Sequence, residues 1–137
     1  MTHRVFLAFL VFGLVACGDS TGPESVVGTY TLQTVNGEGL PAVIDEIGTT
    51  FLKEITAGSI TLNEDLTCSF SLSERETEDG EVTTRTETLE TDECTYTIDN
   101  GVLTLTVEEE GDANLSIIGS AITLVDPDTG DVYVFEK

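Results

Sequence analysis

The sequence predicts an all-β domain, an antiparallel up-and-down meander of about eight to ten short strands closed into a small barrel. From residue 26 onward, apolar and polar residues alternate with a period of two, the pattern of strands with one buried face. Glycine, asparagine and aspartate interrupt the alternation at short intervals, and helical periodicity is nearly absent. Closure of such a meander removes the exposed edges that an open sheet would leave.

The clearest predicted hairpin spans residues 94–107. Asn100-Gly101 supplies the two positive-φ positions of a type I′ turn. Pairing across this turn sets Tyr96 opposite Leu105 and Cys94 opposite Val107, so the partners on the inward face are apolar.

Two further hairpins follow from the same reasoning. One turns at Gly119-Ser120 and places Ile117 against Ile122 and Leu115 against Leu124 on the inward face. The other turns at residues 63–66. After the turn at 63–66, alternation puts three residues on one face: Cys68, Phe70 and Leu72.

The remaining predicted strands lie at 26–35, 49–55 and 132–136. Tyr133 and Phe135 on the last of these are expected to point inward. The segment between the first two contains glycine and proline and gives no clear pattern.

The N-terminus predicts export. Arg4 precedes a run of twelve residues, 5–16, that carries no charged side chain and is too short to span a bilayer as a helix. Leu14 occupies a place that ordinary signal cleavage reserves for a small residue. Leu14-Val15-Ala16-Cys17 instead resembles the lipobox of bacterial lipoproteins.

That resemblance implies a lipoprotein signal peptide at 1–16 and lipidation of Cys17, with a diacylglyceryl group on the sulfur and a further acyl chain such as palmitate on the freed amine. Residues 17–25 then form the lipidated cysteine and a flexible tether, and the domain occupies 26–137. The expected location is the bacterial cell envelope, anchored to a membrane by lipid. Gly18 stands where inner-membrane lipoproteins carry aspartate, which favours the outer membrane.

The charge balance limits the partners. The chain has a formal net charge of −21, and removal of residues 1–16 takes away one basic residue, Arg4, and none of the 26 acids. Nucleic acid is therefore excluded as an expected partner, because phosphate binding needs a basic face. The membrane is contacted through the lipid anchor alone.

Short motifs resemble the lipocalins. Gly28-Thr29-Tyr30 is similar to their Gly-X-Trp, with tyrosine in the tryptophan position, and the strings at 58–63, 95–101 and 133–137 are similar to those of small lipocalin-like domains on bacterial lipoproteins. The resemblance implies a barrel that holds a small hydrophobic ligand. The inward residues expected to line such an interior are Phe70, Tyr96, Leu105, Val107, Tyr133 and Phe135.

Cys68 and Cys94 are predicted to form a disulfide. With Cys17 committed to lipid, they are an even pair in an exported chain, and both have inward parity. A redox-active pair is disfavoured, because they lack a Cys-X-X-Cys spacing and a basic neighbour.

The sequence gives no catalytic or cofactor motif. The single histidine, His3, leaves with the signal peptide, so the mature chain has no Ser-His-Asp arrangement and no imidazole for zinc. Residues 126–131 have the alternating oxygens of a calcium loop, but Lys137 stands where an EF-hand has its last ligand, so a turn is the better interpretation. We expect a protein that is not an enzyme and binds no metal.

Residues 73–93 carry nine acids and are expected to form a hairpin arm that projects from the barrel. An alternative function follows from this arm. The barrel is then filled by its own side chains, and the acidic surface and the arm contact a protein partner whose identity is unknown.

Overall fold

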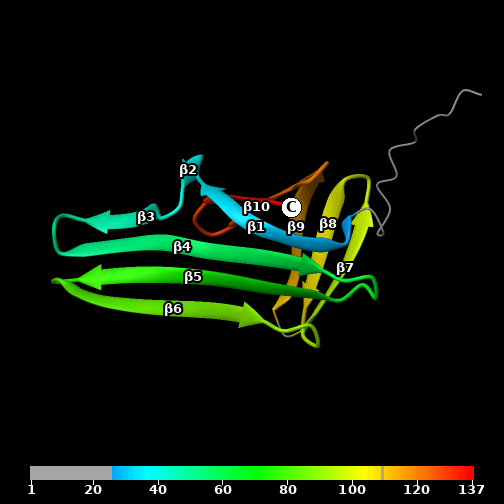
Figure 1. Ribbon diagram of the computed structural model, residues 1–137, viewed down its shortest axis with the longest axis horizontal. Helices are drawn as coiled ribbons and strands as arrows, with labels where there is room; N and C mark the ends of the chain where they lie inside the picture. Colours follow the sequence, from blue (N-terminus) through cyan, green and yellow to red (C-terminus); the bar gives the residue numbers. More distant parts are fainter. Residues whose placement is uncertain (1–25, 109) are drawn as a thin grey trace, which may run out of the picture.

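The computed structural model describes residues 26–108 and 110–137 (Figure 1). The predicted signal peptide, Cys17 and the tether lie outside these residues. No helix in the described part of the chain is long and apolar enough to cross a membrane. The described residues form eleven strands: β1 Gly28–Val35, β2 Glu38–Gly39, β3 Ala42–Ile47, β4 Phe51–Leu62, β5 Cys68–Glu78, β6 Glu81–Leu89, β7 Cys94–Asp99, β8 Val102–Val107, β9 Gly111–Ile118, β10 Ala121–Val125 and β11 Val132–Glu136.

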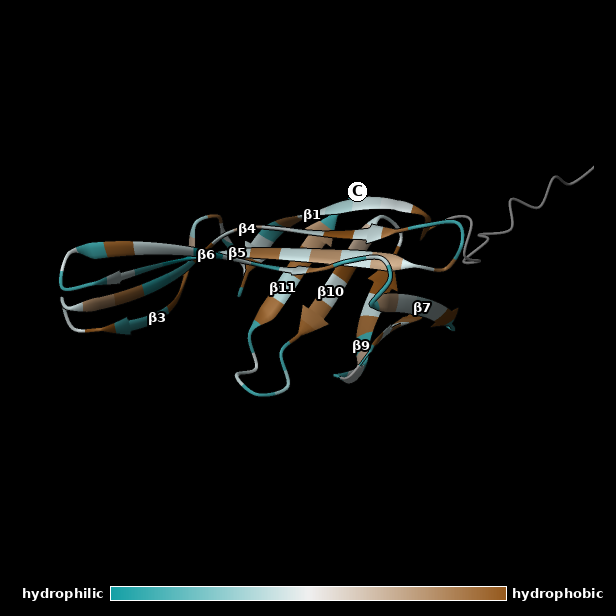
Figure 2. Cartoon of the chain, turned by 90° about the horizontal axis from the view of Figure 1, so that it is seen from below, coloured by the Kyte–Doolittle hydropathy of each residue, from teal (hydrophilic) through white to brown (hydrophobic). Residues whose placement is uncertain are grey.

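All strand pairs are antiparallel and belong to one sheet, with the order β6-β5-β4-β1-β11-β10-β9-β8-β7. The first and last strands are neighbours, since β1 lies between β4 and β11. β2 pairs only with β1, and β3 pairs only with β4. The sheet curls so that β1, β4 and β5 face β7, β9 and β10 (Figure 2).

The turns set the register of the hairpins as predicted. Asn100 and Gly101 have φ values of 49° and 78°, and β7 pairs with β8 so that Tyr96 is opposite Leu105. Gly119, with φ of 60°, allows β9 and β10 to pair with Ile117 opposite Ile122. The prediction of three hairpins is confirmed, because β4 and β5 also pair across the turn at 63–66.

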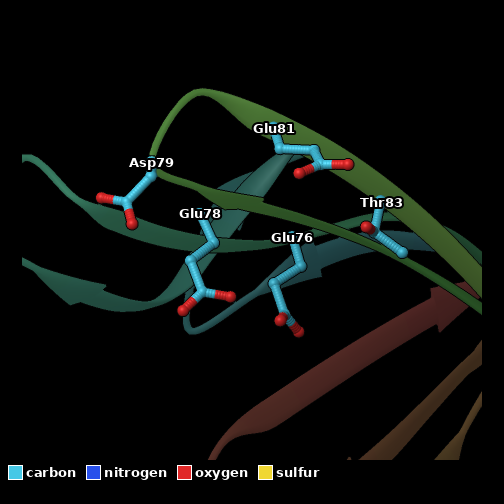
Figure 3. A pocket seen from close by; sticks show the side chains of 5 residues that line it. All are labelled: Glu76, Glu78, Asp79, Glu81 and Thr83. Carbon is cyan, nitrogen blue, oxygen red and sulfur yellow. The ribbon is translucent and has the colours of Figure 1, made fainter.

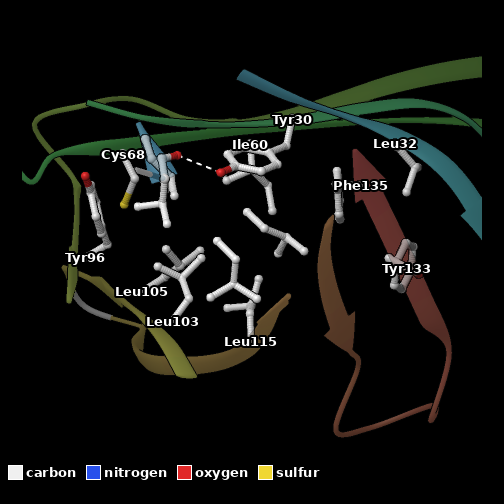
Figure 4. Close-up of a cluster of buried hydrophobic side chains, with 14 of the residues drawn as sticks. Tyr30, Leu32, Ile60, Cys68, Tyr96, Leu103, Leu105, Leu115, Tyr133 and Phe135 are labelled. Atoms are coloured by element: carbon white, nitrogen blue, oxygen red, sulfur yellow. Dashed lines mark hydrogen bonds between the residues drawn. The ribbon is translucent and has the colours of Figure 1, made fainter. Parts of the chain in front are cut away.

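The core fills the space between the two layers of the curled sheet (Figure 4). Tyr30, Ile60, Leu103 and Phe135 are completely buried. The Tyr30 hydroxyl donates a hydrogen bond of 2.7 Å to the Val26 carbonyl, so burial of this phenol leaves no unmet polar group.

The barrel is closed at one end only. The disulfide between Cys68 and Cys94 joins the start of β5 to the start of β7, with the two Cα atoms 5.1 Å apart. Beside it, Thr67 bridges to Thr95, and the Tyr96 N–H donates a hydrogen bond of 2.9 Å to the Leu66 carbonyl. The predicted disulfide is confirmed.

The barrel is open at its other end. β6 pairs with β5 but not with β7, so β6 and β7 are the two edges of the sheet. The all-β, antiparallel fold class is confirmed, but the closure is partial and the sheet forms a half-barrel. β5 and β6 extend past the barrel into the projecting part of the sheet (Figure 1).

An arm projects beyond this open end, and it is wider than the predicted hairpin of 73–93. It consists of β3, the first half of β4, the second half of β5, and β6. Asp79 and Gly80 form its tip turn with φ values of 51° and 86°. Within it, Glu54 is buried and accepts contacts of 2.9 and 2.8 Å from the Arg75 guanidinium, which supplies the partner that a buried carboxylate needs.

Candidate functional site

A cavity of about 430 Å³ lies at the open end of the half-barrel. It is bounded on one side by β5 and β6 and on the other by β10, β11 and the loop that joins them. Its volume falls within the range of about 300–1,000 Å³ that is usual for small-molecule sites. Its lining residues are Phe70, Leu72, Glu87, Glu110, Leu124, Asp126, Pro127, Asp128 and Tyr133.

The floor of this mouth cavity is apolar. Phe70 and Leu72 from β5 face Leu124 and Tyr133 from β10 and β11 across the gap between the layers. Phe70 rests edge-on against Phe135, with ring centroids 6.5 Å apart. Because Phe135 is fully buried, this contact anchors the floor to the packed core.

The rim of the mouth cavity is acidic. All four charged residues that line it are carboxylates, namely Glu87, Glu110, Asp126 and Asp128. The four carboxylates come from three different parts of the chain. Glu87 is on β6, Glu110 is in the turn before β9, and Asp126 and Asp128 are in the β10–β11 loop. The fold thus brings together negative charges that are distant in sequence.

The β10–β11 loop is held in place by its own polar groups. One carboxylate oxygen of Asp126 accepts hydrogen bonds from the backbone N–H groups of Asp128, at 2.8 Å, and Thr129, at 3.2 Å. Asn36 ties the loop to the end of β1, because its amide donates to the Asp131 carboxylate at 2.8 Å and accepts from the Val132 N–H at 2.9 Å. Asp126 and Asp131 therefore stabilise the turn expected from the sequence.

Tyr133 is the most polar group in the floor. Its side chain is only 6% exposed although it lines the cavity. Burial, and then the negative charges of Asp131, Asp126 and Glu74, raise the pKa of Tyr133 to about 12. Its hydroxyl makes no hydrogen bond with another described residue and is not fully buried, so it is accessible to solvent and to a ligand from the cavity.

The predicted lining residues separate into two groups. Phe70 and Tyr133 line the mouth cavity. The other four are buried and do not line it: Tyr96, Leu105, Val107 and Phe135. Tyr96 packs at the closed end, where its hydroxyl donates a hydrogen bond of 2.7 Å to the Asn63 carbonyl.

Sequence reasoning placed Leu72 and Leu124 on the inward face but did not assign them to the site. It also treated the acids of the rim as part of a general acidic surface. Alternation reveals which side chains point inward, but it does not reveal which part of the interior stays open.

A second, smaller cavity of about 190 Å³ lies at the tip of the arm (Figure 3). Glu76, Glu78, Asp79, Glu81 and Thr83 line it. Among residues 26–108 and 110–137, no group of three or more histidine, cysteine, aspartate or glutamate side chains is arranged to hold a metal ion. The tip is thus a hydrated acidic surface without an apolar floor.

The tyrosines give a test of the core by pH. Burial is the largest cause that raises the pKa of Tyr30, Tyr96 and Tyr133 above the ordinary value of 10.0, and these are all the tyrosines of the chain. Since the folded state holds these protons more tightly than the unfolded state, the stability they contribute is complete below pH 10. We expect it to be lost as the pH rises from 10 towards 12.

The measurement is the free energy of unfolding against pH, with tyrosinate absorbance recorded in parallel. We expect the tyrosinate absorbance of the folded domain to rise at a higher pH than that of free tyrosine, until the domain unfolds. A full tyrosine equivalent that ionises at its ordinary pKa while the free energy of unfolding stays constant would contradict this account of the core.

The comparisons with known proteins agree with the fold. A family model described as a lipocalin-like domain matches residues 26–125, which contain β1 to β10. Searches of curated proteins and of solved structures find no significant match. The matched segment covers more than half of the chain and includes Phe70, Leu72 and Leu124 of the cavity floor. This chain therefore belongs to the family of lipocalin-like domains.

Proposed function

We propose that the domain binds a small ligand with an apolar body in the mouth cavity. The observation that carries the proposal is the apolar floor of Phe70, Leu72, Leu124 and Tyr133 in a cavity of about 430 Å³. Family membership supports it, because a barrel of the lipocalin type can hold one small ligand. The proposed role is binding, because the lining combines an apolar floor with a rim of carboxylates.

The same proposal includes a lipid anchor. The lipobox-like sequence before Cys17 supports lipidation there, and Gly18 after it supports attachment to the bacterial outer membrane. The domain would then act at the membrane surface, where apolar molecules are available.

A fluorescent probe tests ligand binding. The mature chain, residues 17–137 with Cys17→Ser, is titrated with N-phenyl-1-naphthylamine, which is uncharged at neutral pH. We expect saturable binding at one probe per domain. Leu124→Trp, which fills the cavity from β10, should lower the affinity about tenfold or more, equivalent to about 1.4 kcal/mol.

Val125→Trp is the matched control. Val125 is the next residue on the same strand, is 52% exposed, and does not line the cavity. Its substitution should leave the probe affinity unchanged. Absence of saturable binding, or equal losses in the two variants, would refute the proposal.

A second candidate function is contact with a protein partner through the arm. The observation that favours it is β6, an edge strand whose residues are almost all exposed, including Val82 at 59%. Unpaired backbone groups on such an edge accept a further strand. If no apolar probe binds the mouth cavity, contact with a protein partner through the arm becomes the favoured function.

A further inference from the structure

We propose that the ligand of the mouth cavity is an amphiphilic cation, with an apolar body on the floor and a protonated amine at the rim. This inference rests on the proposed binding function and adds the chemical class of the ligand. It starts from the arrangement of the lining, in which apolar residues are grouped at the floor and carboxylates at the rim.

The first argument is charge complementarity. Glu87, Glu110, Asp126 and Asp128 face the cavity, and no lysine or arginine lines it. The two salt bridges among the described residues lie in the arm, where Lys53 pairs with Glu74 and Arg75 with Glu54. A ligand with an anionic head would be repelled at this rim, whereas an ammonium group would find four carboxylates within a short span.

The second argument is Tyr133. Tyr133 is 6% exposed, it lines the cavity, and its hydroxyl makes no hydrogen bond with another described residue and is accessible to solvent. The phenol oxygen has lone pairs that accept a hydrogen bond from an ammonium group, and the ring face attracts a cation. The carboxylates of Asp131, Asp126 and Glu74 make the electrostatic potential at this phenol negative, as the rim carboxylates do at the cavity mouth. Both potentials favour a cationic group.

The third argument is that the rim charges are not all required for the fold. Asp126 caps the β10–β11 loop, but the described hydrogen bonds and salt bridges involve no side-chain atom of Glu87, Glu110 or Asp128. These three carboxylates remain solvated near one another above an apolar floor. A cationic head group would neutralise the repulsion between these carboxylates.

Three ligands with one tail and different heads test the proposal: decylamine, decanol and decanoate, each below its micelle concentration. Displacement of N-phenyl-1-naphthylamine from the mature chain with Cys17→Ser gives their affinities. We expect decylamine to bind at least about tenfold more tightly than decanoate, with decanol between them. The ratio should shrink as salt is raised, because the rim is exposed to screening.

A variant with Glu87→Gln, Glu110→Gln and Asp128→Asn should bring the decylamine-to-decanoate ratio close to one while decanol still binds. The matched control removes three charges at the arm tip, with Glu78→Gln, Asp79→Asn and Glu81→Gln, and should leave the ratio unchanged. Equal effects of the two triple variants would show that net charge alone sets the preference and would overturn the proposal.

The outcomes separate this proposal from the binding function on which it rests. If all three ligands bind equally, the cavity binds apolar tails and the cationic preference is wrong. If decanoate binds best, it is also wrong. If none of them displaces the probe, or the probe itself does not bind, both fail.

Discussion

Loss of the disulfide should lower the free energy of unfolding by about 3 kcal/mol, because it releases a loop of 26 residues in the unfolded chain. For a domain of this size the midpoint of thermal unfolding should fall by about 10 to 20 °C. The effect is large because the disulfide lies where the sheet closes. Without it, the start of β5 and the start of β7 are joined there by the bridge between Thr67 and Thr95 and the hydrogen bond from Tyr96 to Leu66.

Two treatments measure this contribution. One is reduction of the unchanged domain, and the other is the pair Cys68→Ala and Cys94→Ala, which avoids placing a serine hydroxyl at two buried positions. Both should lower the thermal midpoint, and alkylation before reduction should find neither cysteine reactive. An unchanged midpoint after complete reduction would show that the backbone contacts alone close the barrel.

Cys17→Ser should abolish lipidation completely. The sulfur that would receive the diacylglyceryl group is missing, so we expect the precursor to remain uncut between Ala16 and Cys17. Incorporation of an alkyne-labelled fatty acid should fall to background. Two or more acyl chains anchor a protein stably, at about 0.8 kcal/mol for each buried CH₂ group, so the unmodified protein should hold its membrane and the variant should lack that anchor.

Gly18→Asp tests the membrane to which the lipidated protein is sorted. It should keep the lipid but move the protein from the outer to the inner membrane in bacteria that sort by this residue. Efficient cleavage of the Cys17→Ser chain to a soluble product would remove the lipoprotein assignment. Fractionation of the unchanged protein with the inner membrane would remove only the proposed destination.

The hairpins could be predicted because their causes are local. Asn100-Gly101 selects its turn type, and alternation on both sides of the turn then fixes which residues meet. The pairing of Cys68 with Cys94 could be predicted for a related reason. Each cysteine has inward parity on its own strand, and the chain contains no third cysteine in the domain.

The crossing between the first strand and the hairpins could not be predicted. β4 is one strand of twelve residues, but a bulge between Ile55 and Ala57 shifts its register, so Ile55 and Ile60 are both buried although five positions apart. A strict period of two breaks at the bulge, and the sequence therefore suggests two elements. β2 and β3 depend on pairing with β1 and β4, which local pattern does not reveal.

The mouth cavity could be predicted only in part. Phe70 and Tyr133 were expected as lining because they point inward, and the same argument selected Tyr96, Leu105, Val107 and Phe135, which pack in the core. The difference is set by where the edge strands β6 and β7 stay unpaired and the barrel is open. Local alternation does not reveal which strands become the edges of the sheet.

The most direct test of the central claim is a map of amide and methyl chemical shifts as N-phenyl-1-naphthylamine is added to the isotope-labelled domain. The account predicts shifts centred on Phe70, Leu72, Leu124 and Tyr133, with Tyr96 at the closed end unchanged. Shifts centred on Tyr96, Leu105 and Val107 would place the ligand in the barrel interior, and shifts confined to the arm would place it outside, and either result would contradict binding at the mouth.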